Sequence, residues 1–188
     1  MSDGTRSSAI TATAPASSAT FASAGVGSGS HLAAEYFFKV HAKAKVLHVP
    51  FRGGAPAIQA VLGDQIDLIA SSFGVTSQVV EGKLTGLAVA SPLRNPAMPN
   101  VPTYKESGFD FEAESWVGFF VPAKTDPKVV AQLNAAINEV VSDQAGRDYL
   151  TKVGFRVVPR SAAESQAYLA SEVAKWCEMV RTVGVYVD

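Results

Sequence analysis

The sequence predicts an α/β protein with parallel strand pairing, and three observations carry this fold class. Beyond residue 20, short apolar segments typical of strands alternate with longer segments whose apolar residues recur at helical spacing. Connections of this length suit the crossover helices that parallel strands need. The 188 residues, 47% of them hydrophobic and 18% charged, are enough for one core or two small lobes.

The first two thirds of the chain are predicted to supply the sheet. Strands are expected at 20–23, 46–50, 65–71, 84–91 and, as a longer apolar run, 115–122. A helix is expected over about 30–42, and another behind the sequence FRGGAP, where Pro56 suits the first helical turn. A short helical link should precede the fourth strand, and four prolines within 91–108 predict a loop.

The last third is predicted to be helical. Asp126 and Pro127 suit an N-cap and a first helical residue, and Ser161 with Glu164 has the spacing of a capping box. The helix behind Ser161 carries one apolar stripe that we expect to be buried: Leu169, Val173, Trp176, Val180 and Val183. The single cysteine, Cys177, is expected to be a small buried hydrophobe on this helix.

The charge pattern argues against several classes of partner and cofactor. A formal net charge of −1 gives no indication of binding to nucleic acid or to an anionic membrane surface. The local basic residues Lys39, Lys43, Lys45 and Arg52 are typical of a solvated edge, and an anion-attracting rim is the alternative. One cysteine and three scattered histidines show no ligand spacing, so we expect no metal and no cofactor.

Residues 1–19 differ in composition from the rest of the chain. They are rich in serine, threonine and alanine and lack the apolar stretch of an export signal, so we predict a flexible or tag-like segment. No run in the sequence approaches the ~20 apolar residues of a membrane-spanning helix. We therefore expect neither a signal peptide nor a membrane anchor in this chain.

The sequence FASAGVGSGSH at 21–31 joins a predicted strand to a predicted helix through three glycines. Such a junction gathers free backbone N–H groups at a positive helix end, which suits an oxyanion. Ser30 stands where a dinucleotide fingerprint needs its third glycine, no lysine completes a Walker loop, and Ser28 lacks the flanking glycines of a hydrolase elbow. A carboxylate-type site and a plain tight turn stay open as the two interpretations.

Candidate catalytic groups are few. His31 at the predicted helix start could donate to an anion, whereas His48 in an apolar strand is expected to be a hydrogen-bonded structural histidine. Asp67 alternates with Ile66 and Leu68 on a predicted strand, and no second acid lies on that strand for acid–base work. A hydrolase that used Ser28 or Ser30 with His31 would need a third group to orient the histidine. We therefore predict that the chain is not an enzyme.

Four long motifs, in this order, resemble one family. They read FASAGVGSGSHLAAEYFF, HVPFRGGAPAIQAVLGDQIDLI, GKLTGLAVASPLRNPAMPNVPTYKESG and SWVGFFVPAKTDPKVVAQLN. Over about 20–188 the chain resembles the Bug-type, TctC-like solute receptors of tripartite tricarboxylate transporters. The resemblance implies a type II periplasmic-binding-protein fold whose two hinged lobes close around a small carboxylate. It also implies a periplasmic location, delivery to membrane transporter subunits, and no catalysis.

The resemblance assigns ligand-binding residues to two loops. The glycine stretch would be the carboxylate loop of the second lobe, through Gly25, Gly27, Ser28, Gly29, Ser30 and His31. A following loop on the same rim would hold Pro50, Phe51, Arg52 and Gly53. After the third strand, the family's usual aromatic-acid pair is replaced here by Ala70 and Ser71, so Ser71 would take the place of an acid near the ligand.

The resemblance also predicts a partial architecture. Residues 20–118 would form one complete α/β lobe, and 119–188 a hinge strand with the C-terminal helical part of the other lobe, whose N-terminal segment is absent. Exposed helix faces in such a fragment favour a homo-oligomer, with 119–188 supplying most of the contact and Trp176 and Val180 inside it. An interaction or sensory protein with the same fold is the alternative function.

Overall fold

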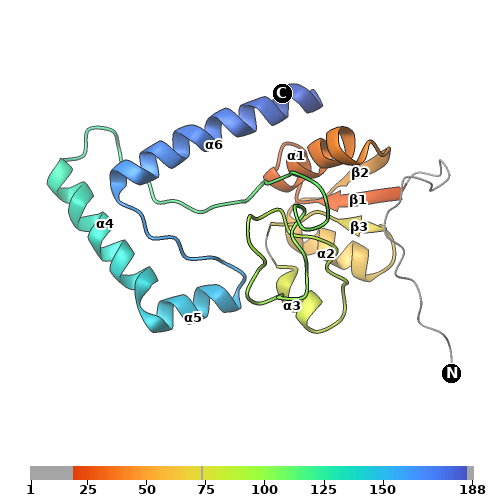
Figure 1. Ribbon diagram of the computed structural model, residues 1–188, viewed down its shortest axis with the longest axis horizontal. Coiled ribbons are helices and arrows are strands. Elements are labelled where there is room, and N and C mark those ends of the chain that lie inside the picture. Colours follow the sequence, from red (N-terminus) through yellow and green to blue (C-terminus); the bar gives the residue numbers. More distant parts are fainter. Residues whose placement is uncertain (1–18, 73, 186–188) are drawn as a thin grey trace.

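The computed structural model describes residues 19–72 and 74–185, and its sheet confirms the predicted α/β class (Figure 1). Three parallel strands lie in the order β2-β1-β3, and they are β1 (Ala19–Ser23), β2 (Val46–Pro50) and β3 (Leu68–Ile69). In the register of the sheet, Phe21 of β1 stands beside His48 on one side and Leu68 on the other. All three strands therefore end at the same edge, where parallel sheets place their ligand sites.

The helices among residues 19–80 follow the three strands as predicted. Helix α1 (Gly29–Tyr36) continues directly into a π-helical segment, η1 (Phe37–Ala42), which ends at Lys43 in the left-handed region. Helix α2 (Gly54–Leu62) has Pro56 in its first turn, and the short α3 (Thr76–Val80) forms the predicted helical link.

The buried core is aromatic. Phe37 packs against Phe111, Ala113 and Met179 in one buried cluster, so η1, the segment after the proline-rich loop, and the C-terminal helix meet there. Phe21 and Ala22 of the central strand are almost fully buried on the sheet.

The last third is helical, as predicted. It holds α4 (Pro127–Ser142), α5 (Gln144–Lys152) and α6 (Ala162–Val183). Asp126 caps α4 through a 2.8 Å bond from the Lys128 amide, and Ser161 and Glu164 form a complete capping box at α6. Helices α4 and α5 lie apart from the sheet, and α6 runs back to it and packs on α1 (Figure 1).

Two predicted strands are wrong. Residues 84–91 make only an isolated parallel bridge, between Val89 and Thr103, and 115–122 have no regular secondary structure. Both segments are apolar enough for strands, but a strand also needs a neighbour for its backbone groups. The backbone of Val89 pairs with the loop at Pro102 and Tyr104 instead.

The predicted stripe of α6 overlaps the buried face at Val183, and Leu169, Trp176 and Val180 are half-buried. The buried residues are Glu172, Met179 and Val183, whereas Val173 is 54% exposed. Cys177 is exposed, so its predicted burial is wrong. The face is set by the contact with α1, which covers one side of α6 only (Figure 1).

One polar contact joins α6 to η1, and a second buried polar group of α6 is paired within the helix itself. The buried carboxylate of Glu172 accepts a hydrogen bond from the Trp176 indole (3.2 Å) and pairs with Lys175. Lys39 of η1 donates to the carbonyl of Val183 at 2.9 Å, a cation at the negative end of a helix. No helix among residues 19–72 and 74–185 is both long and apolar enough to cross a membrane.

Candidate functional site

The glycine-rich loop connects the end of β1 to the start of α1, and Ser28 fixes its shape. The Ser28 hydroxyl donates to the Gly25 carbonyl at 2.7 Å and accepts from the His31 amide at 3.2 Å, so Ser28 is the N-cap of α1. Gly25 and Gly27 have φ values of 134° and 75°, which side chains rarely allow. The glycines are therefore required by the turn itself.

Only part of the loop's backbone is available to a ligand. The Gly27 amide donates to Nδ1 of His31 at 3.1 Å, and the Ser28 amide donates to the Gly25 carbonyl at 3.2 Å. Gly29 and Ser30 occupy the first two positions of α1, where no carbonyl of the same helix is in reach of the amide. If the predicted loop binds an anion, we therefore expect the amides of Gly29 and Ser30 to donate to it.

A second helix begins beside the first. The amides of Phe51 and Gly53 donate to the carbonyls of Ser23 and Ala24 at 3.1 Å each, which ties the loop after β2 to the loop after β1. Gly53 has a φ of 107° and lets α2 begin at Gly54. Because β1 and β2 are adjacent and parallel, the N-termini of α1 and α2 lie at the same edge of the sheet.

Both helix starts open onto one cavity of about 380 Å³. It is lined by Ala24, Ser28, Gly29, Ser30, Gly54, Ser71, Ser72, Ser115 and Trp116. Five of these residues carry hydroxyls, and none of the lining residues that the structure describes is charged. An anion here would be held by N–H groups, hydroxyls and two helix dipoles rather than by a cation.

The structure brings together four of the predicted ligand residues. Ser28, Gly29, Ser30 and Ser71 line the cavity, whereas the other seven do not: Gly25, Gly27, His31, Pro50, Phe51, Arg52 and Gly53. Gly25 and Gly27 shape the loop, and Phe51 and Gly53 tie the two loops together. Arg52 and Pro50 are exposed, and a direct contact of Arg52 with a ligand stays a prediction.

Sequence reasoning missed the wall opposite the loop. Ser115 donates to Ser72 at 2.7 Å across 43 residues of sequence, and Trp116 stands beside them at the cavity. No local spacing links positions this far apart. Gly54 could have been predicted from the sequence as a site residue, because it follows Gly53 at a helix start that Pro56 indicates.

Two histidines stack beneath the loop. The rings of His31 and His48 lie with centroids 3.8 Å apart, and His31 is only 4% exposed. Burial lowers the pKa of both, and that of His48 falls to about 4, with the neighbouring His31 as a second cause. Both rings are therefore neutral at pH 7, and only neutral His31 can accept the Gly27 amide at Nδ1.

The remaining candidates have structural partners. His48 bonds to the Ser23 hydroxyl at 2.7 Å, which confirms the prediction of a hydrogen-bonded structural histidine. Asp67 accepts from the backbone and side chain of Thr20 at 2.9 and 2.7 Å, and these bonds lower its pKa. Within residues 19–72 and 74–185, no three His, Cys, Asp or Glu side chains come together as metal ligands.

Comparison with known proteins decides the family. The model of the tripartite tricarboxylate transporter family receptor, TctC, matches residues 8–185. The chain belongs to this family. The match begins within the segment 1–19, whose first 18 residues lie outside the described part of the chain.

The chain spans about half the length of several of the curated relatives that it matches. Protein BugT of Bordetella pertussis is 31% identical over 166 residues, which span 87% of this chain and 51% of BugT. A TctC solute-binding protein from Polaromonas is 31% identical with a TM-score of 0.72, over 88% of this chain and 57% of that one. MatC of Rhodopseudomonas palustris, solved with bound malate, is 30% identical with a TM-score of 0.70, over 86% and 56%.

These structural neighbours confirm the expected periplasmic-binding-protein fold, of which this chain spans a part. The family is one of solute receptors, and the described residues bring no nucleophile, base and orienting group together at the cavity. The predicted boundaries of the lobes stay predictions.

Proposed function

We propose that this chain is the carboxylate-binding part of a solute receptor that serves a tripartite tricarboxylate-type transporter in the periplasm. One observation carries the proposal: the N-termini of α1 and α2 open onto the same hydroxyl-lined cavity. Each helix start offers the equivalent of roughly half a positive charge, so two of them can balance one carboxylate. Family membership supports the transport role, and the malate bound to MatC supports the ligand class.

A calorimetric titration at pH 7 tests the proposal. We expect malate and succinate to bind, and their diamides, which have the same carbon skeleton without the charges, to bind at least tenfold more weakly. Because no cation lines the cavity, raising the salt from 50 to 300 mM should weaken binding by less than about threefold. Equal binding of acid and diamide, or of neither, contradicts the proposal.

We also propose that a second copy of the chain covers an apolar surface made of Val117, Phe119, Phe120 and Val121. Phe119 and Phe120 are 76% and 68% exposed in the single chain, and Val117 is 66% exposed. This surface replaces the predicted contact at Trp176 and Val180, which are partly buried on α6, Trp176 beside Gly29 at the start of α1. Two-fold pairing is the commonest way for a protein to cover such a surface.

Charged residues at this surface should separate the copies. We expect the unaltered chain to be a dimer by light scattering coupled to gel filtration, and the double variant Phe119→Asp, Phe120→Asp to be a monomer, because a buried unpaired charge is strongly unfavourable. Leu93→Asp is the control, since Leu93 is similarly exposed (64%) but lies in the proline-rich loop. If the unaltered chain is monomeric, the proposal that a second copy covers this surface is wrong.

The alternative function, an interaction or sensory protein with this fold, predicts a different result from the same measurements. Two results together would favour this alternative function. The chain would form a tight complex whether or not a carboxylate is present, and malate and succinate would give no calorimetric signal.

A further inference from the structure

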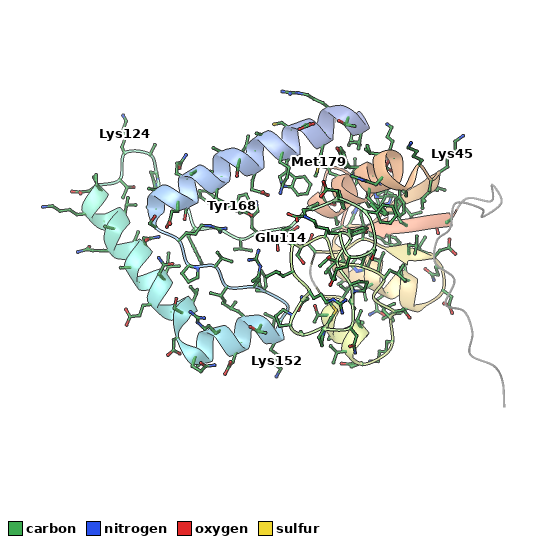
Figure 2. The ribbon with its side chains drawn as sticks, in the orientation of Figure 1. Lys45, Glu114, Lys124, Lys152, Tyr168 and Met179 are labelled. Carbon is green, nitrogen blue, oxygen red and sulfur yellow. The ribbon has the colours of Figure 1, made fainter. Side chains whose placement is uncertain are left out.

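The wall of the cavity that faces the glycine-rich loop comes from the segment that connects the lobe to α4. This wall is made of Ser115 and Trp116, far in sequence from every other lining residue. The segment is held at this place from three sides. Ser115 donates to Ser72, Glu114 pairs with Arg156 at 2.8 Å, and the Trp116 ring meets Tyr168 of α6 edge-on with centroids 6.2 Å apart (Glu114 and Tyr168 are labelled in Figure 2).

Tyr168, which contacts Trp116, is itself in contact with the cation of Arg160. The guanidinium of Arg160 lies 4.1 Å above the Tyr168 ring, so Tyr168 is itself fixed between Arg160 and the indole. A ring held in this way loses little conformational freedom when a ligand packs on it. Trp116 is still 37% exposed and has surface to offer at the cavity.

Several hydroxyls of the cavity already have hydrogen-bond partners within the protein. The Ser28 proton is donated to Gly25 and the Ser115 proton to Ser72, and Ser30 accepts from the Ala24 amide at 3.4 Å. The backbone N–H groups at the starts of α1 and α2 are the polar contacts on which the proposal rests. Trp116 is the one large apolar side chain among the described residues that line the cavity with them.

We propose that Trp116 is a specificity-determining residue, whose indole packs against the carbon body of a carboxylate held at the starts of α1 and α2. This rests on the proposed function. The indole favours carboxylates with an apolar chain, because each methylene that it covers leaves water. No acidic side chain lines the cavity to pair with an ammonium group, so amino acids are disfavoured.

A dicarboxylate series of increasing length tests the role of Trp116. Malonate, succinate and adipate are titrated into the unaltered chain, Trp116→Phe and Trp116→Ala. We expect Trp116→Ala to weaken adipate about tenfold and malonate by less than about twofold, because only the longer chain reaches the ring. Trp116→Phe keeps an aromatic face and should restore most of the preference for adipate. The matched control is Tyr149→Ala, which removes an exposed aromatic ring of α5, away from the cavity.

Fluorescence gives an independent readout, since the chain has two tryptophans. In Trp176→Phe, where Trp116 is the remaining tryptophan, adipate should still change the emission, because its carbon chain packs on the indole. If Trp116→Ala loses the same affinity for all three acids, or loses none, Trp116 does not determine specificity and the proposed function still stands. Failure of the unaltered chain to bind any of the three overturns the proposed function and this inference with it.

Discussion

Aspartate in place of Ser72 is expected to abolish carboxylate binding, with a loss of at least about 100-fold in affinity. Ser72 lines the same cavity as Gly29 and Gly54, the first residues of α1 and α2. A carboxylate tethered there occupies the positive helix ends itself, and it repels a second carboxylate in the same cavity. Calorimetry with succinate measures the loss.

The stability of the variant separates this explanation from misfolding. Aspartate near two helix starts should leave the free energy of unfolding unchanged or raise it by about 0.3–1 kcal/mol. The control is Ser72→Asn, which is similar in size to aspartate but uncharged, and it should bind succinate within a few-fold of the unaltered chain. Binding by Ser72→Asp that matches Ser72→Asn would show that the cavity is not an anion site.

The helix starts of this chain could be predicted because their signals are local. Asp126 with Pro127 and Ser161 with Glu164 fix the starts of α4 and α6 within a few residues. The glycine-to-helix junction was likewise readable, because a strand, a turn that needs glycine and an N-cap lie within eleven residues. The carboxyl edge of the sheet followed from parallel pairing.

What depends on distant partners could not be predicted. Whether 115–122 forms a strand is decided by a neighbouring strand, and the described chain brings none to it. The buried face of α6 is set by its contact with α1 and not by the pattern of its own apolar residues, which is why Val173 is exposed and Glu172 buried. Trp116 escaped notice for the same reason, because its place at the cavity depends on Tyr168 and Ser72.

The histidine stack connects the stability of the fold with the shape of the glycine-rich loop. His48 bonds to Ser23 at the end of β1, and Ser23 also accepts the Gly25 amide at 3.2 Å. His31 accepts the Gly27 amide. The two rings thus hold the loop near both of its glycines with positive φ, and the His31 contact requires the neutral ring, because Nδ1 accepts the Gly27 amide. The charged group nearest to His31 is Glu35 on α1, 4.0 Å away, and on the side of β2 its titratable neighbour is His48.

Acid is therefore expected to destabilise the protein between about pH 6.5 and pH 4. The pKa of His48 is 6.5 in the unfolded chain and about 4 in the fold, and that of His31 is lowered in the same direction. As the pH falls through this window, the unfolded chain binds protons that the folded chain does not, so the free energy of unfolding falls, and the contribution of His48 to this loss is complete below about pH 4. His48 is only partly buried, and screening by solvent reduces the loss to about 1–2 kcal/mol.

Urea unfolding followed by circular dichroism from pH 7.5 to pH 4 measures this loss. His48→Gln cannot bind the proton and keeps a donor for Ser23, so it should flatten the profile across the window while leaving stability at pH 7.5 within about 1 kcal/mol of the unaltered chain. His41→Gln is the control, because it changes a histidine that contacts Tyr36, Phe37 and Phe111 rather than the loop. If His48→Gln follows the unaltered chain from pH 6.5 to pH 4, the stacked histidines do not govern the acid response.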